Sequence, residues 1–206
     1  MNLQLAHQNM IKGQVLPMGV SCPTVIAALA QVPRHLFLPK ELTSIAYIDN
    51  HIEFGHNRYL LSPSCFARLL QAAEIKNTDK VLDIGCLFGY SSAVLSCLAS
   101  KVTAVECENS FAAIAHNNLH KYDLDNVITL KNELCQGYAK CGPYDVIIIN
   151  GSVNQISEDL LSQLSEGGRL VGILQENNVG KAIILTKKNN SYAKNILFEE
   201  NLPSFF

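Results

Sequence analysis

Three features that mark membrane, secreted and nucleic-acid-binding proteins are missing from this sequence of 206 residues. No stretch approaches the roughly 18 consecutive apolar residues of a membrane span, and the first residues lack the apolar core of a signal peptide. The formal net charge is -2, so no excess of positive charge favours a nucleic acid or an anionic membrane surface. We therefore expect neither a nucleic acid nor a membrane among the partners.

Paired cysteine spacing is missing as well. The seven cysteines are scattered, no Cys-x-x-Cys occurs, and an odd number cannot all pair within one chain. This usage is typical of free thiols in a reducing compartment rather than of a disulfide framework. The sequence thus predicts a cytoplasmic protein.

The one spacing that suits a metal is incomplete. His116 and His120 stand four residues apart in a predicted helix, as paired metal ligands often do. No third ligand lies nearby, and the surrounding segment HNNLHKYD is typical of a solvated helix face. We expect no metal.

The composition present is that of a globular protein, with 48% hydrophobic and 17% charged residues and no repeat or low-complexity linker. We expect one domain over residues 1–206, in which residues 1–62 form a helical N-terminal extension and a substrate loop. Residues 63–206 would form a cofactor-binding core and the C-terminal strands.

Apolar residues at helical spacing over 23–32 predict a helix that Pro33 ends. Ser62 and Pro63 form a good N-cap for a helix over 62–75.

From residue 80 onwards, short β-branched runs alternate with helical segments. The runs predict strands over 80–85, 101–106, 126–131, 144–150, 169–174 and 182–188, with helices over 90–100, 110–124 and 157–168. Alternation at this spacing is typical of right-handed βαβ units and a parallel sheet covered on both faces. No helix separates the final strands, so an antiparallel hairpin is expected at the sheet edge. The predicted fold is α/β and doubly wound.

A glycine-bearing turn joins the first of these strands to its helix in VLDIGCLFGYSSAVL (81–95). Such a turn lets a ligand approach the backbone beside the positive end of a helix. About twenty residues after Gly85, the next strand ends in Glu106, where a carboxylate can accept hydrogen bonds from both ribose hydroxyls of an adenosine. The plainer alternative, an ordinary tight turn and a surface glutamate, becomes less attractive because the two features occur together in this order.

The spacing of the glycines distinguishes two cofactors. A nicotinamide dehydrogenase would carry glycines at the first, third and sixth places, but the run from Gly85 to Tyr90 lacks the third and the sixth. Asp83, which precedes the first glycine, and the unaccompanied final strands fit an S-adenosylmethionine site better.

At this point the sequence resembles the protein-L-isoaspartate O-methyltransferase family over about residues 8–175. It is most similar to a divergent bacterial branch with an Arg-Tyr-Leu-Leu run. The resemblance rests on VPRHLFLP (32–39), AYIDN (46–50), FGHNRYLLSP (54–63), VLDIGCLFGYSSAVL, YDLDNV (122–127), GPYDVIIING (142–151) and LSEGGRLV (164–171). It implies a seven-stranded class I methyltransferase sheet, Rossmann-like, with an antiparallel last strand.

The resemblance also implies cofactor roles for particular residues. Asp83, Gly85, Cys86 and Gly89 match the family's first glycine-rich turn, and Glu106 matches its ribose-binding acid. Glu133 and Leu134 fall where the family has an Asp-Gly pair beside the adenine. In two places the sequence departs from the family: Leu87 replaces the middle glycine of the turn, and Glu133 is one methylene longer than the family's Asp.

The substrate loop departs further. The family reads approximately Gly-x-Gly-Gln-Thr-Ile-Ser-x-Pro over residues 55–63, and its Thr and Ser hydroxyls position the acceptor carboxylate. Here Arg58 stands at the Gln, Tyr59 at the Thr and Leu61 at the Ser. Two interpretations stay open: a repacked apolar lid, or a changed acceptor pocket in which Arg58 is the anion-binding fork and Tyr59 contributes to catalysis.

The function implied is S-adenosylmethionine-dependent methyl transfer to a carboxylate, on a protein or peptide that carries isoaspartate or on another carboxylate acceptor, by a monomer. A carboxylate with an ordinary pKa near 4 is already ionised at pH 7, so the enzyme needs alignment and no general base. Because both hydroxyls are absent, the loop predicts weak isoaspartyl activity. The alternative is an altered or inactive paralogue that binds the cofactor and methylates a different acceptor or acts as a scaffold.

Overall fold

A seven-stranded sheet organises the computed structural model, which describes residues 2–189 and 191–205. The strands are β3 (Lys80–Ile84), β4 (Lys101–Glu106), β5 (Val127–Lys131), β6 (Tyr144–Val153), β7 (Leu164–Glu176), β8 (Val179–Lys188) and β9 (Ser191–Glu199). Their order is β5-β4-β3-β6-β7-β8-β9. The pairs from β5 to β7 are parallel, whereas β7 with β8 and β8 with β9 are antiparallel. The doubly wound fold with an antiparallel last strand is confirmed.

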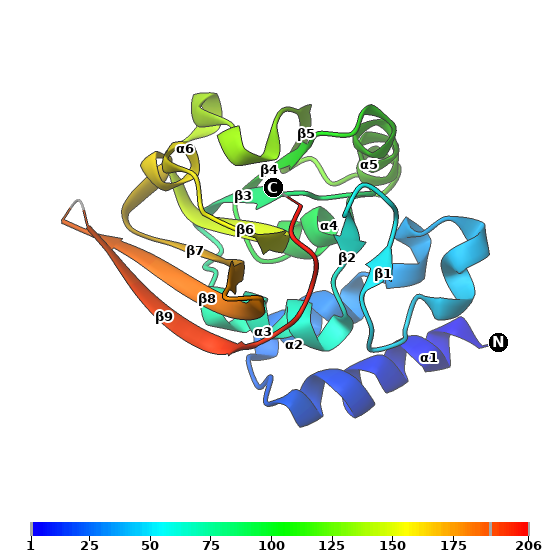
Figure 1. Cartoon of the computed structure of the whole chain (residues 1–206). Helices are drawn as coiled ribbons and strands as arrows, with labels where there is room; N and C mark the ends of the chain where they lie inside the picture. Colours follow the sequence, from blue (N-terminus) through cyan, green and yellow to red (C-terminus); the bar gives the residue numbers. More distant parts are fainter. Residues whose placement is uncertain (1, 190, 206) are drawn as a thin grey trace.

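Helices cover both faces of the sheet (Figure 1). One face packs against α2 (Pro23–Gln31), α3 (Pro63–Ala73), α4 (Tyr90–Ser96) and α5 (Asn109–Lys121). The other packs against the short α6 (Glu158–Ser162) and the loops around it. The Val and Ile residues of β3 and β6 are buried on both faces, as expected for central parallel strands.

The N-terminal extension is helical, as the sequence predicts. It runs through α1 (Leu3–Met10), a π-helical turn over 11–15, short 3₁₀ turns over 16–18, 34–37 and 40–45, and α2 between them. Ser62 caps α3 as expected, because its hydroxyl accepts a hydrogen bond from the Cys65 amide at 3.3 Å.

The helix expected over 157–168 is wrong in its second half. Helix α6 ends at Ser162, and β7 already begins at Leu164. Between the pairs Tyr144–Leu164 and Val146–Arg169 the register shifts, and Gly167 takes a left-handed conformation in the extra residues. Gly167 and Gly168 therefore lie in an irregular part of β7, whereas their sequence pattern predicts the end of a helix.

The substrate loop is a small hairpin between β1 (Ile52–Glu53) and β2 (Tyr59–Leu60). Gly55, His56 and Asn57 all have positive φ, and the Arg58 amide donates to the Gly55 carbonyl at 2.8 Å. Figure 1 places this hairpin next to the C-terminal segment, near the end of β6. The tight turn fixes the backbone from which Arg58 projects.

Candidate active site

The glycine-bearing turn lies at the carboxyl end of β3, where open α/β sheets bind ligands. Gly85 has a φ of +77°, and its amide donates to the Val105 carbonyl at 2.8 Å. Gly89, with a φ of +91°, is the N-cap residue of α4. Both positions need a left-handed backbone that glycine adopts without strain, so the turn predicted from the sequence is present.

Asp83 forms the floor of the turn and is completely buried. Its carboxylate accepts hydrogen bonds from the hydroxyls of Ser91 at 2.8 Å and Ser92 at 2.5 Å and from the side-chain amide of Asn150. Burial raises the pKa of Asp83 to about 6, and these three hydrogen bonds oppose the rise. Because the folded-state pKa lies above the ordinary 3.8, this carboxyl contributes stability at low pH that is lost as the pH rises towards 6. Asp83 therefore supports the turn from inside the protein, and its carboxyl group is not exposed to a ligand.

Glu106 lies at the end of β4, fully buried, with both carboxylate oxygens engaged. One oxygen accepts from the amides of Cys107 at 3.0 Å and Glu108 at 3.4 Å. The other accepts from the Leu87 amide at 2.8 Å, which ties the Glu106 carboxylate to the glycine turn. The glycine-bearing turn and Glu106, which the sequence prediction paired, are therefore in direct contact.

The second oxygen of Glu106 has another partner, the guanidinium of Arg58, at 2.7 Å. Arg58 is 1% exposed, and its guanidinium lies so close to Gly85 that a side-chain carbon on that glycine would come within 2.6 Å of it. Nε and Nη1 of Arg58 have no hydrogen-bond partner among residues 2–189 and 191–205. The residue expected to bind an acceptor anion instead neutralises the acid expected to bind ribose.

The C-terminal segment packs against Arg58 and Gly151. The Arg58 guanidinium lies 4.6 Å from the centre of the Phe205 ring, and the Phe205 amide donates to the Ser152 carbonyl at 2.9 Å. Gly151 allows this contact, because any side chain there would overlap the Phe205 ring. The resemblance found in the sequence ended near residue 175 and assigned no role to Phe205. Phe206 lies outside the described residues.

Leu61 and Tyr59 differ in their surroundings. Leu61 is 2% exposed and belongs to the main hydrophobic core, whereas Tyr59 is half-buried beside it. Both line a closed cavity of about 10 Å³ together with Gly85, Leu87 and Asn150. The apolar-lid interpretation therefore fits Leu61, and Tyr59 stays a candidate for contact with the acceptor.

Arg34 is a residue whose importance sequence reasoning missed. It is fully buried, lines the same cavity, and donates to the Leu61 carbonyl at 2.5 Å. Its guanidinium also lies 5.2 Å from the centre of the Tyr90 ring, and burial lowers its pKa. The segment VPRHLFLP was noted only for its resemblance, since nothing in it indicates that Arg34 reaches the loop.

The other expected cofactor residues surround the turn. Cys86 is buried, and burial raises the pKa of its thiol, so it is a packing residue. Glu133 is exposed and precedes a 3₁₀ turn over 134–136, in which Leu134 is buried against the far face of the sheet. The Asn132 amide donates to the Glu106 carbonyl at 3.2 Å, which brings this segment to the edge where Glu106 lies.

Leu87 has a φ of +49°, so it keeps the left-handed backbone of the glycine it replaces. A non-glycine residue there is strained by about 1 kcal/mol, and its side chain lines the closed cavity. We expect Leu87→Gly to tighten S-adenosylhomocysteine binding several-fold, measured by calorimetry. Leu87→Ala, which removes the bulk but keeps the strain, separates the two causes. Unchanged or weaker binding by Leu87→Gly would show that the side chain does not obstruct the cofactor.

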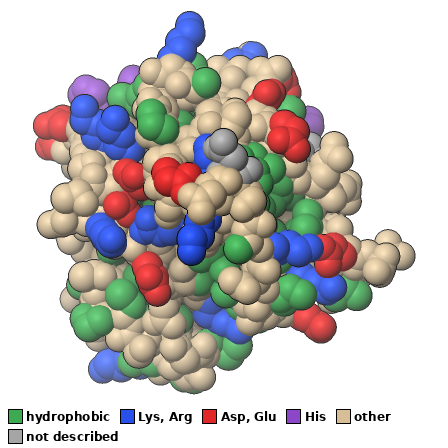
Figure 2. All heavy atoms as spheres, turned by 90° about the vertical axis from the view of Figure 1, so that its left-hand side faces the viewer, with side chains coloured by type: hydrophobic (Ala, Val, Ile, Leu, Met, Phe, Trp, Pro, Cys, Tyr) green, Lys and Arg blue, Asp and Glu red, His purple; other side chains and the backbone are tan. Residues whose placement is uncertain are grey.

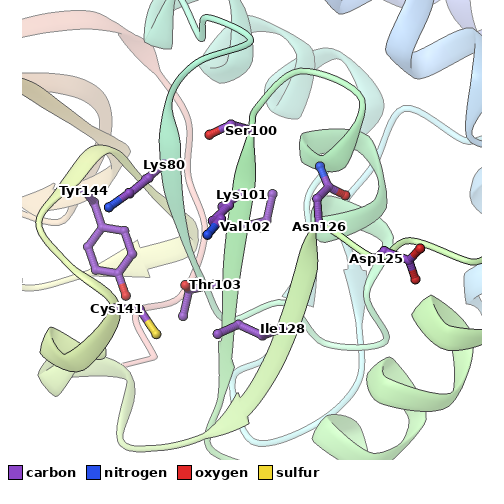
Figure 3. Close-up of a pocket in the computed structure, with 10 residues that line it drawn as sticks. All are labelled: Lys80, Ser100, Lys101, Val102, Thr103, Asp125, Asn126, Ile128, Cys141 and Tyr144. Atoms are coloured by element: carbon purple, nitrogen blue, oxygen red, sulfur yellow. The ribbon is translucent and has the colours of Figure 1, made fainter.

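A larger hollow lies elsewhere. It has a volume of about 570 Å³ and covers the outer face of β4 and β5 towards their amino ends (Figure 3). Its lining includes Lys80, Lys101, Thr103 and Tyr144. None of these four residues belongs to the turn at Gly85 or hydrogen-bonds to the Glu106 carboxylate. Because α/β sheets bind their ligands at the carboxyl ends of the strands, we place the site at Gly85 and Glu106.

The thiols and histidines add no second site within the described residues. All seven cysteines are free. No cluster of three or more His, Cys, Asp or Glu side chains suited to a metal occurs in residues 2–189 and 191–205, and the rings of His116 and His120 lie 6.3 Å apart. None of the helices in this part of the chain has the length and apolar content of a membrane span.

Comparison with known proteins decides the family. The model of the family Protein-L-isoaspartate(D-aspartate) O-methyltransferase (PCMT) matches residues 6–200. The chain belongs to this family. It is an S-adenosyl-L-methionine-dependent methyltransferase of the protein-L-isoaspartate O-methyltransferase type, and the resemblance found in the sequence is confirmed.

Relatives of the PCMT family support this assignment. The chain is 34% identical to a protein-L-isoaspartate O-methyltransferase of Methanoculleus marisnigri over 165 residues, which are 80% of this chain and 75% of the relative. It is 35% identical to the enzyme of that name from a Picosynechococcus species over 165 residues, 80% of this chain and 74% of the relative.

Solved structures have the same fold. A protein-L-isoaspartate O-methyltransferase superposes with a TM-score of 0.83 and 26% identity, covering 98% of this chain and 65% of its own length. A Plasmodium falciparum protein, solved in complex with S-adenosyl-L-homocysteine, superposes with a TM-score of 0.83 and 20% identity, covering 100% of this chain and 99% of that one. At 20% identity, the similarity to the Plasmodium falciparum protein shows a shared fold only.

The residues present suit S-adenosyl-L-methionine, with one obstacle. Gly85 leaves its face open to a ligand, and the buried Glu106 carboxylate suits two ribose hydroxyls. Arg58 occupies that face and that carboxylate in the conformation described here. The site fits the cofactor once the Arg58 side chain moves.

Proposed function

We propose that this PCMT-family chain methylates isoaspartyl carboxylates of proteins or peptides, with Glu106 and the turn from Gly85 to Gly89 holding the cofactor. The observation that carries the proposal is the hydrogen bond from the Leu87 amide to Glu106, which joins the ribose acid to the turn at 2.8 Å. Leu134 and Glu133 would lie beside the adenine, and Asp83 and Cys86 would support the turn.

The bound cofactor supplies an electrophilic sulfonium methyl group. The chain has to bind the acceptor carboxylate in line with it and exclude water, and it needs no general base because the carboxylate is ionised near pH 7. Tyr59 and Arg58, from the hairpin beside the cavity, are our candidates for contact with the acceptor. Arg34 positions this hairpin through the Leu61 carbonyl.

We further infer a cytoplasmic monomer in which residues 1–206 act as one unit, the extension over 1–62 supplying the acceptor loop to the core over 63–206. The seven free cysteines support a reducing compartment. Acidic and basic side chains intermingle on the face shown in Figure 2, which does not favour nucleic acid as a partner.

Calorimetry with S-adenosylhomocysteine and a radiolabelled-methyl assay on an isoaspartyl peptide test the proposal. We expect micromolar binding, and transfer that an aspartyl peptide of the same sequence does not support. An absence of binding at millimolar ligand would contradict the cofactor site. Binding without transfer to the isoaspartyl peptide would favour the alternative, a chain with a different acceptor or a scaffold.

A further inference from the structure

The ion pair of Arg58 and Glu106 joins two parts of the site that should bind different molecules. Arg58 comes from the acceptor hairpin, and Glu106 belongs to the cofactor half. Their side chains are 2% and 0% exposed, and the guanidinium nitrogen lies 2.7 Å from the carboxylate oxygen. Buried charges of this kind are stable only when they are paired, so each holds the other in place.

The Arg58 guanidinium fills the place where we expect the cofactor ribose to bind. It lies against Gly85, the face that the turn leaves open, and on the carboxylate oxygen that also accepts the Leu87 amide. The cavity beside Gly85 and Leu87, about 10 Å³, is too small for an adenosyl group and holds at most one water. A ribose and the Arg58 guanidinium cannot both occupy this place.

We propose that Arg58 exchanges partners during the reaction: the cofactor ribose displaces it from Glu106, and the released guanidinium then binds the acceptor carboxylate. Cofactor binding thereby prepares the acceptor site, and the order of binding is cofactor first. This inference rests on the proposed function and identifies Arg58 as the residue that couples its two ligands.

Two observations support the second half of the exchange. Nε and Nη1 of Arg58 are buried without a hydrogen-bond partner in the part of the chain that the structure describes, so the guanidinium has donors available for a carboxylate fork. Its neighbours along the hairpin, Tyr59 and Leu61, line the cavity beside Gly85 and Asn150. In the proposed exchange the long Arg58 side chain moves its charge from Glu106 towards that cavity.

The first test measures S-adenosylhomocysteine affinity by calorimetry for the wild type, Arg58→Gln and Arg68→Gln. Arg68 is a matched control, because its guanidinium also stacks on a phenylalanine ring, that of Phe198, at 3.4 Å. We expect Arg58→Gln to bind at least tenfold more tightly, since the ribose no longer competes with a resident cation, and Arg68→Gln to match the wild type. Equal or weaker binding by folded Arg58→Gln would overturn the exchange.

The second test needs only the wild-type protein, so it remains decisive if Arg58→Gln does not fold. Binding of an isoaspartyl peptide is measured with and without saturating S-adenosylhomocysteine, beside an analogue in which the free α-carboxylate of the isoaspartyl residue is a carboxamide. We expect the cofactor product to tighten the carboxylate peptide at least tenfold and to leave the analogue unchanged, because a released arginine recognises the charge. The same gain for both peptides, or for neither, would overturn the role of Arg58.

Failure of the exchange differs from failure of the proposed function. If wild type and Arg58→Gln bind S-adenosylhomocysteine equally and methylate the peptide, only the exchange is wrong. If neither protein binds S-adenosylhomocysteine at millimolar concentration, the cofactor site itself is wrong.

Discussion

Glu106→Ala should weaken S-adenosylhomocysteine binding at least about tenfold, as expected for the loss of charge-assisted hydrogen bonds to two hydroxyls. The same substitution should also lower the free energy of unfolding by about 3 to 5 kcal/mol, because it leaves Arg58 buried without its anion. The carboxylate further holds the amides of Leu87, Cys107 and Glu108, which lose their acceptor. Calorimetry and urea unfolding measure the two effects.

A double variant separates stability from binding. Glu106→Ala with Arg58→Met removes both charges and should recover most of the lost stability, since no unpaired buried ion remains. It should not recover cofactor binding, because the ribose acid is still absent. Recovery of both would show that Glu106 serves folding alone and that the cofactor binds elsewhere.

Restoring the family's hydroxyls should harm the protein rather than improve it. Tyr59→Thr with Leu61→Ser places a small polar side chain at a core position that is 2% exposed. Leucine truncation at such a position costs roughly 2 to 5 kcal/mol, so the melting temperature should fall by several degrees or more. We expect methyl transfer to an isoaspartyl peptide not to rise, because in our proposal Arg58 supplies the contact with the carboxylate.

Arg58→Ala provides the contrast in the same radiolabelled-methyl assay. It should reduce transfer at least about a hundredfold, since misplacement of one reacting group can cost that much. Faster transfer by the Tyr59→Thr, Leu61→Ser variant would mean that the loop lacks only its hydroxyls. Strong turnover by Arg58→Ala would mean that backbone amides or Tyr59 align the acceptor.

Local sequence patterns were sufficient for the framework. The Val- and Ile-rich runs predict β3 to β8, because each is short, β-branched and bounded by turn residues, whereas β9 over 191–199 was not predicted from any run. The Ser62–Pro63 pair predicts the start of α3, and the turn at Gly85 with Glu106 predicts where a nucleotide-like ligand belongs. The second half of the helix predicted over 157–168 was wrong, since the pairing of β6 with β7 draws Gly167 and its neighbours into a strand irregularity that local propensity does not reveal.

The occupant of the cofactor site was decided by contacts between residues far apart in the chain. From the sequence, Arg58 is a substitution in a loop and Glu106 is the end of a strand, 48 positions away. Phe205, close to the C-terminus, packs its ring against the Arg58 guanidinium. The sequence by itself determined the fold class, the family and the chemistry of the turn, because those depend on local pattern and composition. Which charge neutralises Glu106 depends on where the hairpin and the tail pack, and the cost of leaving a buried charge unpaired fixes the choice only after folding brings the three residues together.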